Sequence, residues 1–408
     1  MPSPHPPAQK AQSNSASAPL AIGMVAGETS GDLIGGLLLH GLTTRNPRLT
    51  SVGIGGPAMV QQGFTAWWPH TLLSLMGFGW DVLKQIRKLL TIRHHLERRL
   101  ANQPIHLFIG IDSPDFNLSL EKKLKARGIK TIHYICPSIW AWREGRIKKL
   151  KAACDHVLCV FPFEPDYLAG HGIAATFVGH PLAEIIPLKP NQQAARAQLG
   201  LPQSGPVLAL LPGSRTQEVK RLGHVFFKTA KLILEKFPDL TIVVPTVAHV
   251  REKLHQLSRQ VGFSPQQSAR LMLLNGQSHR ALEACDLTLI ASGTATLEAA
   301  LYKRPMVVAY KLGWGSALLY RYFLRTKQAH FVSLPNILLK KEAVPELLQT
   351  NATPKKLAAA LESWLHALKL PDSPRLQQLE HDFLSLHHSL LCDTQKIACH
   401  AIEQVLES

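Results

Sequence analysis

The chain of 408 residues has no apolar run of the roughly 18–20 residues that a membrane-spanning helix requires. Its first 19 residues, rich in proline, serine and alanine, also lack the basic start and apolar run of a secretory signal peptide. We therefore expect residues 1–19 to form a disordered extension and the remainder to fold without crossing a membrane.

Paired cysteines are missing as well. The six cysteines are scattered, without a C-x-x-C pair or a metal-type spacing to histidine. This argues against a zinc site and a disulfide framework, and it predicts a reduced, cytoplasmic protein. The turn after the first apolar run, AGETSGDLIGG (26–36), has neither the G-x-G-x-x-G spacing nor a P-loop, which argues against nicotinamide enzymes and P-loop ATPases.

Acidic residues are scarce, because 28 Asp and Glu stand against 45 Lys and Arg, for a formal net charge of +17. Residues 122–151 hold ten basic residues against Glu144 alone, and residues 84–99 hold six against Glu97. Such surfaces suit the phosphates of nucleotides, nucleic acids or anionic lipid headgroups. The alternative is a basic face that is merely solvated.

Apolar, strand-like runs alternate with helical patterns, as in βαβ units around a parallel sheet. In the first half we expect strands at 20–26, 105–111, 129–135 and 156–161, and helices at 32–42, 81–100, 116–126 and 143–152. In the second half we expect strands at 207–211, 240–245, 271–274, 287–291 and 306–309, and helices at 218–237 and 294–302. The proline-rich stretch 180–205 separates the two halves.

The predicted fold class is α/β, with two Rossmann-like, doubly wound domains that face a central cleft. We expect these domains at 20–182 and 206–353, a linker at 183–205 and C-terminal helices at 354–408. A cleft between two such domains is the default ligand site.

An aspartate stands at the end of one predicted central strand. In FIGIDSPDFN (108–117), the apolar run ends at Asp112, and Ser113-Pro114 opposes an immediate helix. Ligands of open α/β sheets bind at this strand edge, so Asp112 is a candidate general base. The alternative is an Asp that only forms a turn or caps a helix.

Two turns of the second half suit phosphate groups. In LLPGSRTQEV (210–219), Gly213 allows close approach, Ser214 leads into a helix start with unpaired N–H groups, and Arg215 adds a forked cation. In the second turn, small residues again precede a helix, and Glu298 could accept hydrogen bonds from ribose hydroxyls or merely complement the helix dipole. The small residues of this turn are Ser292, Gly293, Thr294 and Ala295. A third turn, after the first strand, is small and polar and contains Gly27, Glu28, Ser30, Gly31 and Asp32.

Eight motifs occur in an order that resembles the lipid-A-disaccharide synthase family, from about residue 20 to the C-terminal helices. They are AGETSGD (26–32), GIGGPAM (53–59), MGFGWDVL (76–83), FIGIDSPDFN (108–117), IHYICPSIWAWR (132–143), LPGSRTQEV (211–219), ASGTATLEA (291–299) and VSLPNIL (332–338). The resemblance implies a GT-B architecture and an inverting transfer of 2,3-diacylglucosamine from its UDP donor. The acceptor is 2,3-diacylglucosamine 1-phosphate (lipid X) at its 6'-hydroxyl, and the products are a β-1,6-linked disaccharide and UDP.

The resemblance also implies roles for the residues already described. Asp112 would act as the base, and Arg215 would stabilise the departing diphosphate. The turn 292–295 and Glu298 would bind UDP, with Asn336 nearby. The acceptor side would include the 27–32 turn, Trp140, Trp142 and Arg143. No metal or other cofactor is expected, and the family suggests a homodimer joined through C-terminal helices.

Acylated substrates would require contact with a membrane surface. Met76, Phe78 and Trp80 come just before the basic segment that contains Lys84, Arg87 and Lys88, a pattern that could dip into an interface and meet anionic headgroups. We therefore expect peripheral association with the cytoplasmic face of the inner membrane. The alternative is that these apolar residues belong to the core.

Two other classes of protein remain as alternatives. A sugar-nucleotide epimerase or another GT-B transferase, such as one that makes peptidoglycan precursors, would share the two domains, but not IDSPDF together with SIWAWR. A nucleic-acid-binding protein would explain the charge, but the sequence has no RNP-type motif, zinc knuckle or helix-turn-helix. We expect no specific nucleic-acid partner.

Overall fold

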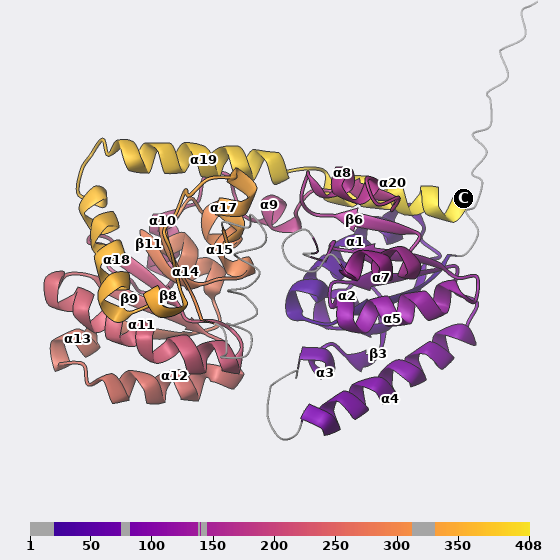
Figure 1. Ribbon diagram of the computed structural model, residues 1–408, viewed down its shortest axis with the longest axis horizontal. Helices are drawn as coiled ribbons and strands as arrows, with labels where there is room; N and C mark the ends of the chain where they lie inside the picture. Colours follow the sequence, from indigo (N-terminus) through magenta and orange to yellow (C-terminus); the bar gives the residue numbers. More distant parts are fainter. Residues whose placement is uncertain (1–19, 75–81, 138, 140–144, 312–330) are drawn as a thin grey trace, which may run out of the picture.

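The structure is a computed structural model that describes residues 20–74, 82–137, 139, 145–311 and 331–408. Its strands form two parallel sheets, each covered by helices (Figure 1). The central strands are continuous apolar runs, because helices cover both faces of a parallel sheet. β4 and β8, for example, are buried at every residue. The predicted α/β class with two doubly wound domains is confirmed.

The first sheet has the strand order β3-β2-β1-β4-β5-β6-β7. Its strands are β1 (Ala21–Ala26), β2 (Thr50–Gly55), β3 (Thr65–Pro69), β4 (Leu107–Ile111), β5 (Lys130–Tyr134), β6 (His156–Cys159) and β7 (Ala175–Phe177). The helices around it are α1 (Thr29–Arg45), α2 (Pro57–Val60), α3 (Thr71–Ser74), α4 (Val82–Ala101), α5 (Pro114–Lys125), α7 (Gly145–Ala153) and α8 (Glu164–Ala169). Strand order reverses between β1 and β4, so this pair forms the switch point of the sheet.

The second sheet has the order β10-β9-β8-β11-β12-β13. Its strands are β8 (Val207–Leu211), β9 (Thr241–Thr246), β10 (Leu271–Asn275), β11 (Leu287–Ala291), β12 (Met306–Tyr310) and β13 (Glu346–Leu348). The helices that accompany it are α10 (Gln192–Gln198), α11 (Thr216–Lys236), α12 (Ala248–Val261), α13 (Pro265–Ala269), α14 (Ser278–Ala284), α15 (Thr294–Leu301) and α17 (Leu334–Leu339). Here the switch point lies between β8 and β11.

Four strands were not expected from the sequence. β2 carries two glycines and two polar residues, which weaken its apolar pattern. β3 lies at the sheet edge and ends at a proline, while β7 and β13 have three residues each and also lie at edges. Edge strands need less apolar sequence, because part of their surface stays exposed to solvent.

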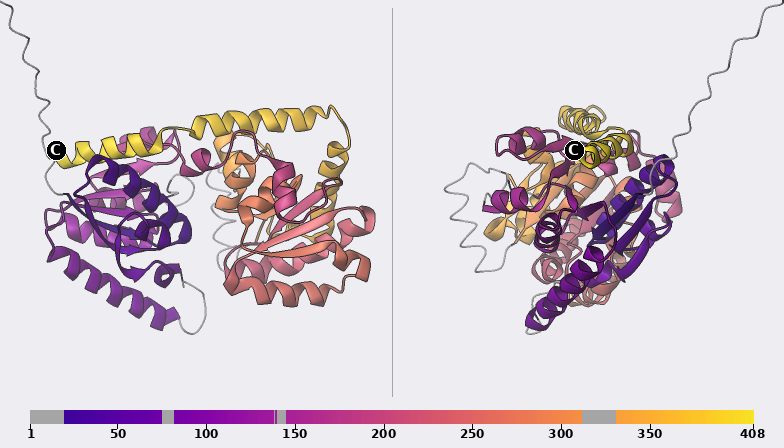
Figure 2. Two further views of the ribbon diagram at one scale, coloured as in Figure 1. Left: turned by 180° about the vertical axis from the view of Figure 1, so that it is seen from behind. Right: turned by 90° about the vertical axis from the view of Figure 1, so that its right-hand side faces the viewer.

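The C-terminal helices connect the two domains. α18 (Pro354–Leu368) packs against α11, and α19 (Pro374–Leu390) packs against α15 and α17 of the second domain. α20 (Thr394–Glu407) returns to the first domain, where it contacts α1, β5 and β6. α19 and α20 thus form a row across both domains (Figures 1 and 2). The expected helices at 354–408 are present, divided between the two domains.

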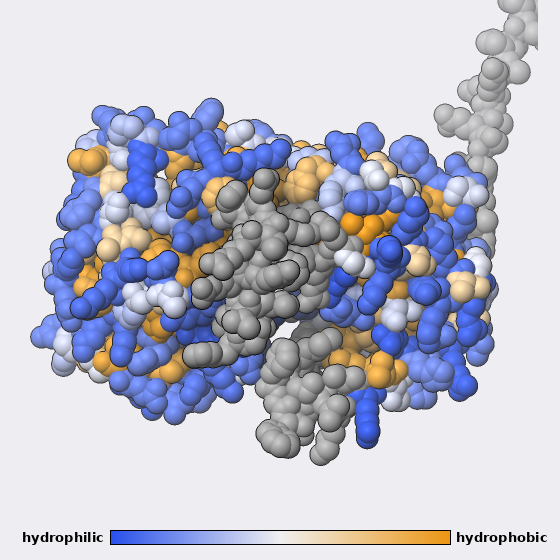
Figure 3. All heavy atoms as spheres, viewed as in Figure 1, coloured by the Kyte–Doolittle hydropathy of each residue, from blue (hydrophilic) through white to orange (hydrophobic). Residues whose placement is uncertain are grey.

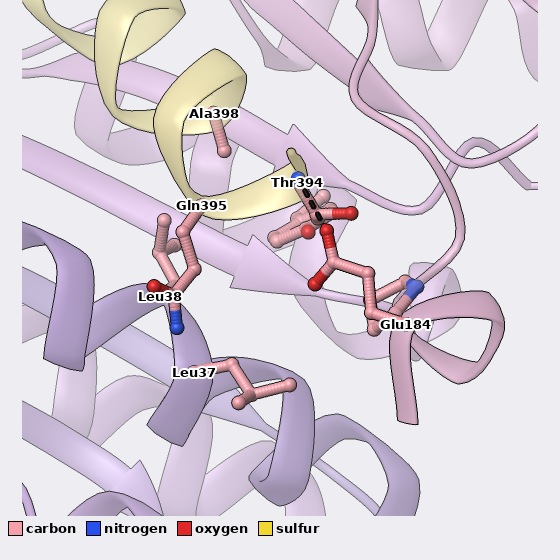
Figure 4. A pocket seen from close by; sticks show the side chains of 8 residues that line it. Leu37, Leu38, Glu184, Thr394, Gln395 and Ala398 are labelled. Carbon is pink, nitrogen blue, oxygen red and sulfur yellow. Dashed lines mark hydrogen bonds between the residues drawn. The ribbon is translucent and has the colours of Figure 1, made fainter. Parts of the chain in front are cut away.

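The chain crosses between the domains at two neighbouring places, near α9 (Pro181–Ile185) and before α20. The backbone N–H of Thr394 donates to Glu184 Oε1 over 2.6 Å, and the N–H of His180 donates to the carbonyl of Leu390 over 2.9 Å. Figure 4 shows this junction, with Leu38 of α1 opposite α20. The two segments that cross between the domains are therefore hydrogen-bonded to each other.

Part of the expected linker packs against the second domain. Arg196 of α10 is 6% exposed; its Nη2 lies 2.6 Å from Asp286 Oδ2, and its Nε donates to the carbonyl of Ala284 over 3.0 Å. Such a pair anchors α10 to the segment between α14 and β11. The boundary at 183–205 stays a prediction.

We predict that Arg196→Ala lowers the free energy of unfolding by about 3 kcal/mol, because it removes one partner of a largely buried ion pair. Urea denaturation would measure the loss. The matched control is Arg259→Ala, whose exposed ion pair with Glu252 should contribute less than about 1 kcal/mol. Equal losses in the two variants would contradict the structural role of Arg196.

Candidate active site

The turns that the sequence analysis selected follow the strands at the two switch points. The 27–32 turn follows β1 and Asp112 follows β4, while Gly213 follows β8 and Ser292 follows β11. Parallel strands end at one edge of a sheet, so each pair of turns shares an edge. These are the positions at which ligands of open α/β sheets bind.

The Asp112 turn has an unusual backbone. Asp112 and Ser113 have φ angles of 51° and 45°, in the left-handed region that costs roughly 1–3 kcal/mol for a non-glycine residue. The Asp112 N–H donates to the carbonyl of Tyr134 over 2.9 Å, and its carbonyl accepts from Asn117 Nδ2 over 2.8 Å. The surrounding structure thus holds the turn in a conformation that the residues alone disfavour.

The side chain of Asp112 takes no part in these backbone contacts. It is half-buried, and within the described part of the chain its carboxylate has no hydrogen bond or ion pair. Ser113, not Asp112, is the N-cap of α5. The reading of Asp112 as a capping residue is therefore wrong, whereas a turn-forming role and a role as a base both stay predictions.

The 27–32 turn packs directly on the Asp112 turn. A Cβ atom on Gly27 would lie 2.2 Å from Ser113 Oγ, so a larger residue there would force the Ser113 side chain to move. Ser30 is exposed at the start of α1, and Glu28 is half-exposed. Two turns that are far apart in sequence are thus brought into contact.

Asp32 has an internal role. Its side chain is 3% exposed and accepts hydrogen bonds from the N–H groups of Gly56 (2.7 Å), Ala58 (2.9 Å) and Met59 (3.2 Å). It therefore caps the start of α2 and fixes the GIGGPAM segment to the 27–32 turn. The position of Asp32 on the acceptor side stays a prediction. Because its carboxylate is already hydrogen-bonded within the chain, Asp32 would influence the acceptor only through the turn that it holds.

One contact joins the turns of the two domains. Arg215 Nη2 lies 3.4 Å from Glu28 Oε1, and Arg215 Nη1 lies 3.6 Å from Glu218 Oε1. The side chain of Arg215 is 68% exposed, which leaves it accessible to a ligand. Arg215 thus faces the first domain, from the start of α11.

The turn around Gly213 differs from the expectation in one respect. Gly213 has a φ of 119°, and a Cβ there would lie 2.5 Å from Glu218 Oε2. That carboxylate oxygen accepts from the N–H groups of Ser214 (3.2 Å) and Arg215 (3.3 Å). The expectation that these N–H groups are unpaired is therefore wrong in this structure, because Glu218 occupies the place of an anion.

The turn after β11 is more open. Gly293 and Thr294 are exposed, and a Cβ on Gly293 would meet nothing within 4 Å among the described residues. Ser292 Oγ donates to the carbonyl of Val332 over 3.1 Å, and Ala295 packs against the core. No residue in the described part of the chain therefore covers the start of α15.

Glu298 lies one turn further along α15, with its side chain 17% exposed. The pKa of its carboxyl is raised, chiefly by burial. His279, whose Nε2 lies 3.8 Å from Glu298 Oε2, opposes this rise. Glu298 is past the first turn of α15, so the simple dipole explanation is weak. Binding of ribose hydroxyls stays a prediction.

Asn336 supports the site from within. It is fully buried, and Nδ2 donates to Val344 O (2.8 Å) and Glu346 Oε1 (2.9 Å). Its Oδ1 accepts from the N–H groups of Ala343 (2.9 Å) and Val344 (3.0 Å). All its hydrogen-bonding capacity is thus used within the chain, so direct nucleotide contact would require rearrangement. Glu346, which the sequence analysis missed, also accepts from Val332 N (2.8 Å), behind Ser292.

Several predicted residues fall outside the described part of the chain. These are Met76, Phe78, Trp80, Trp140, Trp142 and Arg143. Lys84 belongs to α4, and Arg87 and Lys88 are exposed on that helix. None of the described helices is long and apolar enough to cross a membrane. Among the residues coloured by hydropathy in Figure 3, hydrophilic ones cover most of the surface.

Three buried polar residues beneath Asp112 were also missed. Asn117, Glu121 and His133 are 0% exposed, and His133 Nδ1 lies 2.8 Å from Glu121 Oε1. Burial raises the pKa of the Glu121 carboxyl, and the contact with His133 opposes this rise. The spacing of Asn117 and Glu121 on the buried face of α5 was the signal that could have revealed them.

Sequence comparisons identify close relatives. A sequence model of the family described as lipid-A-disaccharide synthetase matches residues 22–402. The chain is 50% identical over 394 residues to a lipid-A-disaccharide synthase of Albidiferax ferrireducens, covering 97% of this chain and 99% of that protein. It is 45% identical over 389 residues to the lipid-A-disaccharide synthase of Pseudomonas aeruginosa, covering 95% and 98%.

Solved structures share the fold at low sequence identity. A putative UDP-N-acetylglucosamine 2-epimerase from Listeria monocytogenes aligns with a TM-score of 0.65 at 10% identity, covering 96% of each chain. MurG of Acinetobacter baumannii aligns with a TM-score of 0.53 at 13% identity, covering 95% of this chain and 100% of that one. These likenesses confirm the expected GT-B architecture.

The contact between the two turns of the first domain can be tested. We predict that Gly27→Ala lowers the free energy of unfolding by about 1–3 kcal/mol, because the added methyl would overlap Ser113 Oγ. Thermal unfolding would measure the effect. Gly145→Ala is the matched control, since a Cβ there meets nothing within 4 Å among the described residues. If both variants melt alike, the turns do not pack as described.

Proposed function

Because the chain belongs to the lipid-A-disaccharide synthase family and is therefore a glycosyltransferase, we propose the substrates and chemistry of its reaction. The donor is UDP-2,3-diacylglucosamine, and the acceptor is 2,3-diacylglucosamine 1-phosphate. The acceptor's 6'-hydroxyl attacks the anomeric carbon of the donor with inversion. The bond between that carbon and the diphosphate oxygen breaks, and UDP leaves. The product is the β-1,6-linked lipid A disaccharide 1-phosphate.

The observation that carries this proposal is the unpaired carboxylate of Asp112 at the switch point of the first sheet. A general base must have a lone pair available for the proton of the attacking hydroxyl. Ion pairing would compete with that role, and Asp112 has no such partner in the described part of the chain. Asp112 therefore takes the acceptor's proton as the new bond forms.

Charge on the departing UDP requires a cation and hydrogen-bond donors on the opposite side. Arg215 can supply a bidentate contact, and its present partners are the carboxylates of Glu28 and Glu218. An incoming diphosphate, with more charge than either carboxylate, would displace them. The N–H groups of Ser214 and Arg215, released by Glu218, would then also face the diphosphate.

The remaining donor contacts come from the second domain. The open start of α15, at 292–295, accepts part of the UDP moiety, and Glu298 accepts hydrogen bonds from the ribose. Asn336 acts by keeping this region in place. The transfer needs no metal ion, since Arg215 and the helix starts neutralise the leaving group, and turnover should persist in EDTA.

The acyl chains of both substrates require an enzyme at the membrane surface. We propose that α4 binds the cytoplasmic face of the inner membrane through exposed basic residues such as Arg87 and Lys88. The helix packs on the first domain through Ile92, Leu96 and Leu100. Arg87 lies on the side away from these residues, and Lys88 is exposed one turn before Ile92. The helix thus presents charge outward, as an anionic surface requires. A homodimer is also proposed, on the family resemblance.

We predict that Asp112→Asn slows UDP release about 10²–10⁴-fold with both acylated substrates, because the amide cannot accept the proton. UDP binding, measured by calorimetry, should stay near normal. Asp115→Asn is the matched control, since Asp115 is exposed and paired with Arg146. Turnover of Asp112→Asn at the wild-type rate would reject the assignment.

We predict that binding to vesicles containing phosphatidylglycerol weakens at high salt, because counterions screen exposed charges. The variant Arg87→Glu/Lys88→Glu should bind at least about 10-fold more weakly than wild type, as each basic residue contributes about 1 kcal/mol. A charge-matched control is Lys355→Glu/Lys356→Glu, in exposed positions of α18. Co-sedimentation that is insensitive to salt and to both variants would contradict the basic docking surface.

A further inference from the structure

The buried face of α5 beneath Asp112 is polar where it meets the first sheet. Asn117 and Glu121 lie four residues apart, on one side of the helix, and both are fully buried. Helices usually pack on sheets through apolar side chains, because buried polar groups lose their hydration. This polar face therefore packs less favourably on the sheet than an apolar face would, so the contacts of its side chains need an explanation.

Asn117 acts directly on the backbone of the Asp112 turn. Its Nδ2 donates to the carbonyl of Asp112 over 2.8 Å and to that of Ile111 over 3.3 Å. These two carbonyls follow each other where β4 ends, at the start of the left-handed turn. One carboxamide thus fixes both peptide groups that flank the Cα atom of Asp112.

Glu121 and His133 hold the neighbouring strand to the same helix. His133 Nδ1 lies 2.8 Å from Glu121 Oε1, and His133 pairs with Gly110 in the register of β4 and β5. The next residue on β5, Tyr134, accepts the N–H of Asp112 through its carbonyl. Both backbone hydrogen bonds of Asp112 therefore lead back to α5, directly or through β5.

Gly110 permits this arrangement. A Cβ at that position would lie 2.1 Å from Glu121 Oε1 and 2.9 Å from the Cβ of Asn117. Within the described residues, Asn117 Oδ1, Glu121 Oε2 and His133 Nε2 have no hydrogen-bond partner. The unpaired atoms of the cluster thus lower stability, while its side chains lie close against β4. Both features are expected of residues that are retained because they fix the backbone at the end of β4.

We propose that Asn117 is a positioning residue that holds Asp112 in the orientation needed for proton transfer, supported by the buried Glu121–His133 pair. This inference rests on the proposed role of Asp112 as the base. Asn117 does not touch the substrate. It acts by keeping the left-handed turn from relaxing, which would move the Asp112 carboxylate away from the attacking hydroxyl.

The test uses Asn117→Leu, which keeps the size of the side chain and removes both donors. We expect kcat to fall about 10–100-fold, because small misplacements of a reacting group are costly, while KM for the UDP donor changes less than about 2-fold. The melting temperature should fall by only a few degrees, because the carbonyls of Ile111 and Asp112 lose their donor while an unpaired buried oxygen is removed. A purely structural Asn117 would leave kcat of the folded variant near wild type when it is assayed well below that temperature.

The matched control is Thr131→Val. Thr131 is fully buried at the opposite end of β5, and its Oγ1 donates to the carbonyl of Ala153 over 3.0 Å. This variant should lower the melting temperature and leave kcat near wild type. If Asn117→Leu does not fold, Asn117→Ala replaces it in the same assays.

The double variant Asp112→Asn/Asn117→Leu separates direct from indirect action. If Asn117 acts through Asp112, the double variant should be no more than about 3-fold slower than Asp112→Asn alone, in single-turnover UDP release. Multiplied losses, or a single Asn117 variant with wild-type kcat, would overturn the inference and leave the base assignment intact. Wild-type turnover of Asp112→Asn would overturn both.

Discussion

The reversal of strand order in each parallel sheet is the constraint on which the site depends. Parallel strands end at a common edge, and the order reverses between β1 and β4 in one domain and between β8 and β11 in the other, which is where ligands of such sheets bind. Four turns that are widely separated in sequence thus reach two edges. β4 is buried along its whole length, so its end is rigid enough to hold Asp112 and Ser113 in left-handed conformations.

Electrostatics between the domains follows from that placement. Arg215 lies between two carboxylates, Glu28 of the first domain and Glu218 of its own helix. Exposed pairs of this kind contribute only about 0–1 kcal/mol, so they orient the guanidinium without holding it firmly. Glu218 also pairs with the N–H groups at the start of α11. The same donors and cation suit a diphosphate, which would exchange with carboxylates already in place.

The sequence predicted the parts of the fold that depend on local pattern. Central strands such as β4 and β8 are continuous apolar runs. Turns such as 213–215 are recognisable from a glycine, a small polar residue and a cation in succession. What could not be predicted depends on distant contacts. The strand at 65–69 is defined by its pairing with β2. The amphipathic pattern of α20 predicts a helix with one buried face, but it does not indicate which of the two domains the helix covers. Nothing local indicates that the carboxylate of Asp32 caps α2, or that Asn336 uses its whole side chain on residues 343–346.

The likeness to an epimerase at 10% identity shows how little of the sequence the fold itself requires. Two parallel sheets need apolar strands and packed helices, which many sequences provide, so the fold alone does not assign an activity. The Asp112 turn is different, because it needs Gly110 for the approach of α5, a left-handed aspartate and a buried amide beneath it. Each of these features costs stability or limits the choice of residue. A fold that needed only to be stable would replace them with apolar packing, so their presence together at the end of one strand supports the proposed role of Asp112.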